Sequence, residues 1–200
     1  SSRYGTEINL EHPVFLMADP ESEAAQRHVA QLSDLGGNLR TVLLRSESEE
    51  AARFTPARYK RRIGSQGTPI TWAFLGLESG AYVLYPGKGG LGTFDPRAQP
   101  WYEGTKKVAK RQPGPRWSVP FADYHGQGYV LTVSQPIYDT EDALLGVAGV
   151  SLTFDYIIET LLQLPENIRG VREVLILNEK GERIISTEDA GKKPEGGRSR

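Results

Sequence analysis

Stacking aromatic side chains and a few polar groups recur in residues 94–102, 116–124 and 134–152 of the 200-residue sequence. Gln99 offers an amide and Asp123 a carboxylate. The aromatic members are Trp101, Tyr102, Trp117, Phe121 and Tyr124. Small-molecule pockets are built in this way, from apolar walls and a few polar groups that fix the orientation of the ligand. The same aromatics could instead pack against a sheet, and the composition of these segments favours neither interpretation.

Catalytic and metal-binding chemistry finds little support elsewhere in the chain. The sequence has no cysteine, which excludes disulfides, thiolate nucleophiles and cysteine-based zinc sites. Its histidines show no i,i+4 pair and no H-E-x-x-H pattern; they are His12, His28 and His125. No G-x-S-x-G elbow is present, although a catalytic triad needs no sequence proximity. We therefore predict no metal site, no catalytic residues and no enzyme, with a soluble enzyme kept as a minor alternative.

A glycine-rich stretch at residues 87–92 fits the pattern G-x-G-x-x-G after a predicted strand. A dinucleotide-binding site needs a helix to begin there, because the helix N-terminus meets the pyrophosphate. Residues 93–96, Thr-Phe-Asp-Pro, predict a loop instead, and no acidic residue lies about 20 positions further on. The stretch is therefore interpreted as a flexible hairpin loop, and no cofactor is expected.

The charge is nearly balanced, with 24 basic and 25 acidic residues and a net charge of -1. This balance predicts no nucleic-acid partner, and the basic run at residues 57–63 is interpreted as a solvated helix face. No apolar run approaches 18 residues, and the N-terminus does not resemble a signal peptide. The chain is thus expected to be either cytoplasmic or a fragment separated from its membrane anchors.

The pattern of elements predicts an α+β fold with an antiparallel sheet. Helix starts at Asp19-Pro20 and Thr55-Pro56 predict two early helices, the first of them ended by Gly36-Gly37. Hairpins are predicted at residues 70–86, 129–152 and 171–186, and an amphipathic helix at residues 154–164 is ended by Pro165. We predict a helical segment at residues 1–60, a main module at 61–165 and the start of an incomplete second module at 166–200.

Four ordered blocks carry a resemblance to a known family: FDPRAQPWY at residues 94–102, WSVPFAD at 117–123, PIYD at 136–139 and GVAGVSL at 146–152. Their order resembles the double Cache (dCache) sensor domains of bacterial chemoreceptors and histidine kinases. The resemblance implies a PAS-like antiparallel sheet flanked by helices, with a ligand pocket in the membrane-distal module. It also implies a periplasmic or extracytoplasmic location, a membrane anchor in the full-length protein, signalling by conformational change, and compatibility with a homodimer.

The resemblance also implies which residues bind the ligand. Carried over position by position, they are Phe94, Gln99, Trp101, Tyr102, Phe121, Asp123 and Ser151. Amino-acid-binding relatives place arginine where Gln99 stands, aspartate where Ser151 stands, and tyrosine at the two phenylalanine positions. Because these changes remove the charged partners of an α-amino acid, a small organic acid or another small metabolite is expected, and not a typical α-amino acid. The alternative is a ligand-independent dimerisation or protein-interaction module with a vestigial pocket.

Overall fold

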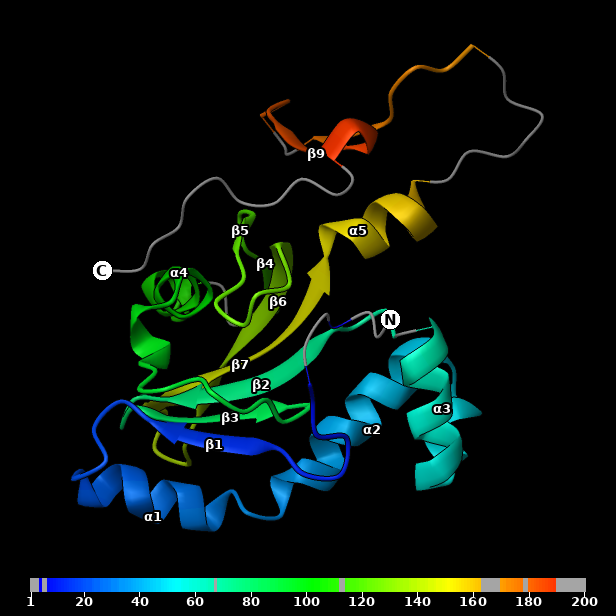
Figure 1. Cartoon of the computed structure of the whole chain (residues 1–200). Coiled ribbons are helices and arrows are strands. Elements are labelled where there is room, and N and C mark those ends of the chain that lie inside the picture. Colours follow the sequence, from blue (N-terminus) through cyan, green and yellow to red (C-terminus); the bar gives the residue numbers. More distant parts are fainter. Residues whose placement is uncertain are drawn as a thin grey trace.

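The computed structural model describes residues 4, 7–66, 68–111, 114–162, 170–177 and 180–189 (Figure 1). Its centre is a seven-stranded antiparallel sheet in the order β1-β3-β2-β7-β6-β4, with β5 paired to β6. The strands are β1 (Val14–Met17), β2 (Trp72–Leu77), β3 (Ala81–Tyr85), β4 (Arg116–Trp117), β5 (Phe121–Ala122), β6 (Tyr129–Tyr138) and β7 (Leu144–Thr153). The predicted α+β class is confirmed.

The hairpins β2–β3 and β6–β7 form where the sequence predicts them. Gly80 closes the first turn with a φ of 85°, a left-handed conformation that glycine adopts without steric cost. In the second turn Asp142 has a φ of 59°, and the Asp139 carboxylate accepts hydrogen bonds of 2.8 Å from the backbone of Glu141 and Ala143. Each turn therefore sets the register of the long strands beside it.

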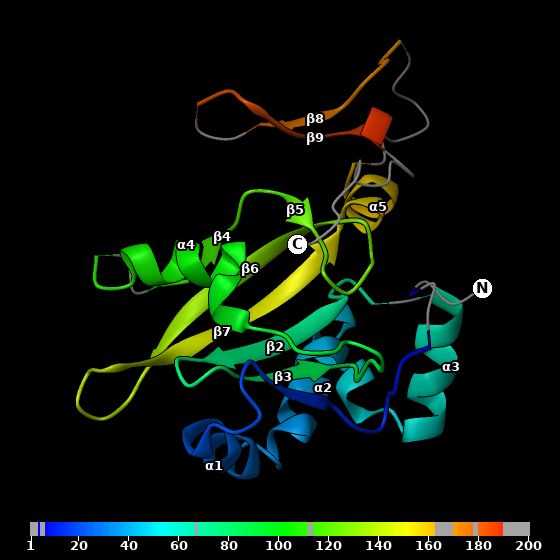
Figure 2. The same cartoon turned by 60° about the vertical axis from the view of Figure 1, so that its left-hand side comes forward.

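Helices cover both faces of the sheet (Figures 1 and 2). Helices α1 (Glu23–Gln31) and α2 (Leu35–Glu47) pack against β2 and β3 on one face, and α4 (Pro100–Val108) packs against β6 and β7 on the other. Every residue of β2 and β3 is buried as a result. The remaining helices are α3 (Pro56–Gln66), α5 (Phe154–Tyr156) and the short η1 (Ala51–Arg53), η2 (Pro96–Ala98), η3 (Ile157–Leu161) and η4 (Thr187–Asp189).

The first predicted helix differs from the structure at both ends. Its N-cap is Ser22, whose side chain accepts from the backbone N–H of Ala25, and it ends at Gln31. Gly36 and Gly37 lie inside α2, so the prediction that they end a helix is wrong. A Cβ at Gly36 would stand 2.8 Å from Cδ of Pro13, so this glycine permits the close approach of α2 to the segment before β1. The second predicted start, at Thr55, is confirmed by α3.

The C-terminal elements follow the predicted order. Thr153 caps α5 by accepting from the backbone N–H of Tyr156, and the chain continues into η3 as a π-helical turn. Residues 163–165, which include the predicted helix end, lie outside the described residues. Strands β8 (Leu175–Leu177) and β9 (Arg183–Ser186) pair as the predicted hairpin, beyond α5 in Figure 2. Ile185 of β9 is fully buried in a cluster with Ile158. The module boundary at residues 165 and 166 stays a prediction.

Candidate ligand-binding site

A small cavity lies on the face of the sheet that carries α4. Six of the seven predicted residues line it: Phe94, Gln99, Trp101, Phe121, Asp123 and Ser151. Tyr124, one of the aromatic residues of the candidate segments, lines it as well, together with four residues that sequence reasoning did not assign to the site: Trp72, Phe74, Tyr82 and His125. The structure therefore brings together the three segments that carry the aromatic and polar groups.

The sheet and a tight loop position the aromatic walls. Trp72 and Phe74 come from β2 and Tyr82 from β3. The loop before α4 is held by Asp95, whose carboxylate accepts from the backbone N–H and the guanidinium of Arg97, and this pairing lowers the pKa of Asp95. The loop lies directly on the sheet: a Cβ added to Gly76 would stand 2.6 Å from Cβ of Pro96 and 3.0 Å from the Trp101 ring.

The aromatic rings fill most of the space between sheet and loop. Ring centroids lie 4.6 Å apart for Phe74 and Trp101, 4.5 Å for Tyr82 and Phe94, and 4.8 Å for Phe94 and Tyr124, all in tilted arrangements. Such contacts are favourable beyond the burial of apolar area. The cavity left between them measures about 10 Å³, which is the space of about one water molecule. The described conformation of the site is therefore closed.

Asp123 is the anionic group of the cavity. Its Oδ2 accepts a hydrogen bond of 3.0 Å from the indole Nε1 of Trp72 and one of 3.1 Å from the backbone N–H of Gln127. Its Oδ1 accepts none from the described residues. The carboxylate is thus fixed in orientation through one oxygen, while the other remains available to a cation or a hydroxyl group.

His125 and Tyr82 form a second polar pair in the cavity. The Tyr82 hydroxyl and Nε2 of His125 lie 3.1 Å apart in a hydrogen bond, and the histidine side chain stacks on the tyrosine ring. Burial lowers the pKa of His125 to about 4, against the opposing influence of Asp123, and Lys88 lowers it further. Burial also raises the pKa of Tyr82. Both side chains are therefore neutral at physiological pH.

The predicted residues Gln99 and Ser151 make contacts within the protein. The Gln99 side-chain amide donates to the backbone oxygen of Asp95 at 3.3 Å. The hydroxyls of Ser151 and Thr132 lie 2.7 Å apart in a hydrogen bond on neighbouring strands. These neutral groups occupy the positions where the related pattern has an arginine and an aspartate.

Of the seven predicted residues, Tyr102 is the one that does not line the cavity; Trp117, an aromatic residue of the candidate segments, is 59% exposed and does not line it either. The Tyr102 ring is fully buried, and its hydroxyl donates a hydrogen bond of 2.8 Å to Oε1 of Glu78. Lys106 binds the other oxygen of Glu78 at 2.7 Å. Burial and the Glu78 carboxylate both raise the pKa of Tyr102. Tyr102 therefore fastens α4 to the end of β2.

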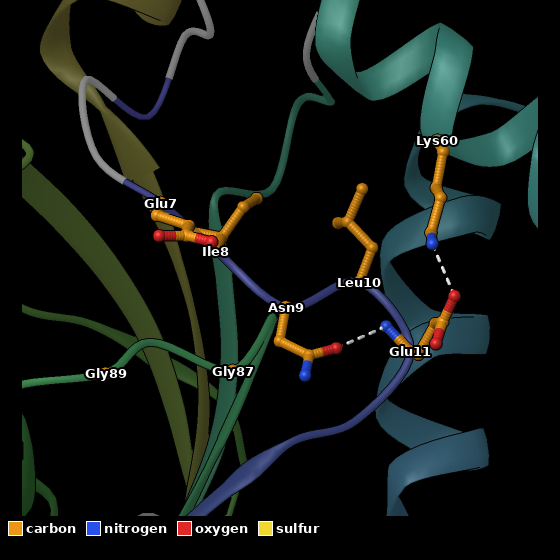
Figure 3. A pocket seen from close by; sticks show the side chains of 8 residues that line it. All are labelled: Glu7, Ile8, Asn9, Leu10, Glu11, Lys60, Gly87 and Gly89. Atoms are coloured by element: carbon orange, nitrogen blue, oxygen red, sulfur yellow. Dashed lines mark hydrogen bonds and ion pairs between the residues drawn. The ribbon is translucent and has the colours of Figure 1, made fainter.

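A larger and more open groove lies between the N-terminal segment, α3 and the loop after β3 (Figure 3). Its volume is about 710 Å³, and its lining includes Asn9, Glu11, Lys60 and Gly87. Glu11 pairs with Lys60 across it, and Asn9 Oδ1 accepts from the backbone N–H of Glu11. The lining also includes Glu7, and none of the described residues that line the groove is aromatic. The aromatic cavity is therefore the better candidate site.

Two features bear on membrane and metal binding. Over the described residues, no helix has both the length and the apolar composition that crossing a bilayer requires. The same residues contain no group of three or more histidine, aspartate or glutamate side chains able to hold a metal ion.

Residues 78–159 match the family model described as methyl-accepting chemotaxis protein-like, first PDC sensor domain. The ligand-binding domain of the amino acid chemoreceptor PctB of Pseudomonas aeruginosa PAO1 is similar in structure. Its complex with L-Arg is 21% identical and has a TM-score of 0.50, covering 82% of this chain and 65% of that one. Its complex with L-Gln is 20% identical with a TM-score of 0.50, covering 82% and 64%. These likenesses establish the fold.

A curated relative is the VWFA and cache domain-containing protein CG16868 of Drosophila melanogaster. It is 27% identical over 142 residues, which are 65% of this chain and 10% of that protein. The chain therefore spans a small part of this relative and somewhat under two thirds of the PctB domain.

One expectation requires correction. The ligand was expected not to be a typical α-amino acid, and the similar PctB structures, which hold L-Arg and L-Gln, contradict this. The expectation gave the absence of a charged side chain at Gln99 and Ser151 more weight than the carboxylate of Asp123, which this chain keeps. In the structure this carboxylate is held in orientation by Trp72, and the hydrogen-bonded pair of Tyr82 and His125 lines the same cavity. The matches confirm the resemblance to Cache sensor domains that the sequence predicts.

Proposed function

We propose that the chain is the extracytoplasmic sensor part of a transmembrane signal transducer, a chemoreceptor or a histidine kinase, and that its aromatic cavity binds an α-amino acid. The observation that carries this proposal is the Asp123 carboxylate. It lies in an aromatic cavity, is oriented through Oδ2 by Trp72, and keeps Oδ1 for a ligand. The match of residues 78–159 to a sensor-domain model supports the same function.

The chemistry of the cavity suits an ammonium group. A charged hydrogen bond from ammonium to Oδ1 is about twice as strong as a neutral one. Trp101 and Phe94 line the same cavity, and a cation near an aromatic face is attracted to it, more strongly when water is excluded. The proposed site residues are Phe94, Gln99, Trp101, Phe121, Asp123 and Ser151. Tyr102 lies outside the cavity and holds α4 to the end of β2 through Glu78. No covalent step is needed, and the domain is proposed to act without catalysis.

Signalling follows from the closed state of the cavity. An amino acid is larger than the available space of about 10 Å³, so it binds only a conformation in which the loop before α4 or the loop at residues 123–128 has moved. A ligand that binds the open conformation better shifts the population toward it. We propose that β7, which contains Ser151, and α5, which follows β7 directly, carry this change toward the hairpin β8–β9 and the membrane.

The test is a thermal-shift screen of the purified chain against the twenty common L-amino acids, with Asp123→Asn as the matched variant. A ligand at 100 times its Kd stabilises by about 2.7 kcal/mol, which corresponds to roughly 5–10 °C for a chain of this length. The asparagine oxygen can still accept from Trp72, so the variant is expected to fold. We expect the shift to be lost in Asp123→Asn, and a shift that persists there would place binding elsewhere.

A second candidate is a ligand-independent interaction module with a vestigial cavity. The observation that favours it is the small volume of the cavity, about 10 Å³. It predicts no thermal shift with any amino acid and unchanged partner binding in Asp123→Asn. If none of the twenty amino acids shifts the melting temperature of the folded wild-type chain, this candidate is favoured over the sensor.

A further inference from the structure

His125 is a buried side chain with an unsatisfied polar atom. It is 5% exposed and lines the aromatic cavity. Its Nε2 is hydrogen-bonded to the Tyr82 hydroxyl, while its Nδ1 is buried and has no partner among the described residues. Buried polar atoms without partners are rare in folded proteins because each costs the desolvation of the group. An unpaired ring nitrogen in a cavity lined by aromatic and polar side chains therefore points to a partner that arrives with the ligand.

The Tyr82 hydroxyl determines which role Nδ1 plays. Among the described residues this hydroxyl makes one side-chain hydrogen bond, the one to Nε2. A phenol is a stronger donor than acceptor, and the unprotonated nitrogen of a neutral imidazole is a good acceptor. The favoured arrangement is therefore O–H of Tyr82 donating to Nε2, which leaves the imidazole proton on Nδ1. Because burial keeps the imidazole neutral, Nδ1 is a neutral donor.

The loop that carries His125 also carries Asp123, two residues earlier. Both side chains line the cavity, and among the described residues neither Oδ1 of Asp123 nor Nδ1 of His125 has a partner, so one loop supplies a free acceptor and a free donor. The ammonium and carboxylate groups of an α-amino acid are attached to a single carbon atom and need partners of this kind close together. Lys88 fixes the loop from the other side by donating to the backbone oxygen of His125.

We propose that Nδ1–H of His125 donates to the carboxylate of the bound amino acid while Asp123 binds its ammonium group. The inference rests on the proposed function, because it assigns the second half of the same ligand. His125 would bind the ligand carboxylate in place of Gln99, whose side-chain amide donates to the backbone oxygen of Asp95. His125 is thus a specificity-determining residue, because it distinguishes amino acids from the corresponding amines.

Two substitutions separate the two ring nitrogens. In His125→Asn the side-chain amide reaches the position of Nδ1, and in His125→Gln it reaches the position of Nε2. We expect His125→Gln to weaken the binding of L-arginine about ten- to a hundredfold, the loss of one hydrogen bond to a charged group. We expect His125→Asn to stay within about threefold of the wild type, because a donor remains near the carboxylate.

The calorimetric titration uses L-arginine and agmatine, which lacks the carboxylate. If another L-amino acid stabilises the wild type more in the panel, that amino acid and its decarboxylated amine are used instead. We expect agmatine to bind the wild type weakly. We also expect His125→Gln to bind agmatine as the wild type does, because the donor that the substitution removes would have had no carboxylate to bind in this ligand. Equal losses for both ligands, or equal losses in the glutamine and asparagine variants, would overturn the assignment in favour of a packing role.

Imidazole ¹⁵N NMR tests the same assignment on the wild-type protein. The chain has three histidines, so His12→Gln and His28→Gln assign the spectrum. We expect the Nδ1–H tautomer before ligand addition and a shift of Nδ1 at saturation. A bound Nδ1 that does not shift would overturn the inference and leave the proposed function intact. A wild type that binds no amino acid in the panel would overturn both.

Discussion

The indole Nε1 of Trp72 donates a hydrogen bond of 3.0 Å to Oδ2 of Asp123, which joins the middle of the sheet to a loop 51 residues further along the chain. Trp72 is fully buried on β2, so its ring cannot turn without disturbing the core. The bond fixes the direction of the carboxylate before any ligand arrives. Preorganisation of this kind lowers the entropic cost of binding.

Trp72→Phe should weaken ligand binding and also lower stability. The substitution leaves Oδ2 of Asp123 with one hydrogen bond, from Gln127, and deletes part of a buried ring. We expect a loss of about 2–4 kcal/mol in the free energy of unfolding and about tenfold weaker binding of the amino acid found in the panel. Urea denaturation and calorimetry measure the two effects.

Tyr102→Phe is the matched control for this variant. It removes a hydroxyl that binds Glu78 and lies outside the cavity. We expect a loss of about 1–3 kcal/mol in stability with unchanged affinity. A loss of affinity in Tyr102→Phe equal to that in Trp72→Phe would show that binding responds to general loosening and not to the orientation of Asp123.

Acid should destabilise the wild type more than His125→Gln. The pKa of His125 is about 4 in the folded protein and about 6.5 in an unfolded chain. Between these values the unfolded state binds more protons, so the free energy of unfolding falls as the pH drops through this window. The expected extra loss for the wild type from pH 7 to pH 4 is about 3 kcal/mol. Urea denaturation at the two pH values measures it, and parallel losses in both proteins would contradict the burial of a neutral imidazole.

Gly76→Ala should displace Pro96 and Trp101 from the sheet. The new methyl group would stand 2.6 Å from Cβ of Pro96 and 3.0 Å from the Trp101 ring, so the loop before α4 must move away from the sheet. We expect a loss of about 1–3 kcal/mol and a change in the tryptophan fluorescence spectrum. Gly104→Ala in α4 is the control, because a Cβ there meets nothing within 4 Å. It should stabilise the helix by about 0.5–1 kcal/mol.

Ile185→Ala tests whether the hairpin β8–β9 is energetically part of the same unit. Ile185 is fully buried beside Ile158, so its truncation should lower the free energy of unfolding by about 2–5 kcal/mol. Leu177→Ala, at a side chain that is 51% exposed, should change it by less than about 0.5 kcal/mol. An unfolding transition that is unaffected by Ile185→Ala would support a boundary at residues 165 and 166.

Much of the fold could be predicted because its signals are local. The hairpins β2–β3 and β6–β7 combine β-branched and aromatic strands with Gly80 and Asp139 at their turns. Strand β1 and helix α2 were not predicted. The strand is four residues long, and α2 holds two adjacent glycines near its start, one of which is required by a contact with Pro13. Local propensity carries no information about that contact.

The site was predicted in part for a similar reason. The aromatic residues and Asp123 stand in motifs with fixed spacing, and those motifs meet at one cavity. His125 was missed because a histidine before two closely spaced glycines indicates an exposed turn, whereas the ring is 5% exposed. Tyr102 was placed in the site by the family resemblance, beside Trp101, although on a helix adjacent residues point about 100° apart. Its ring consequently turns toward Glu78.

The closed cavity has a consequence for the kinetics of recognition. With room for about one water molecule, the site must open before an amino acid enters, so opening sets an upper limit to the speed of association. In a stopped-flow experiment the observed rate constant would then level off at high amino acid concentration instead of rising linearly. The apparent Kd would exceed the intrinsic Kd by the inverse of the fraction of open molecules. Side chains that stabilise the closed packing, such as Phe94 and Trp101, would thereby set the concentration range over which the domain responds.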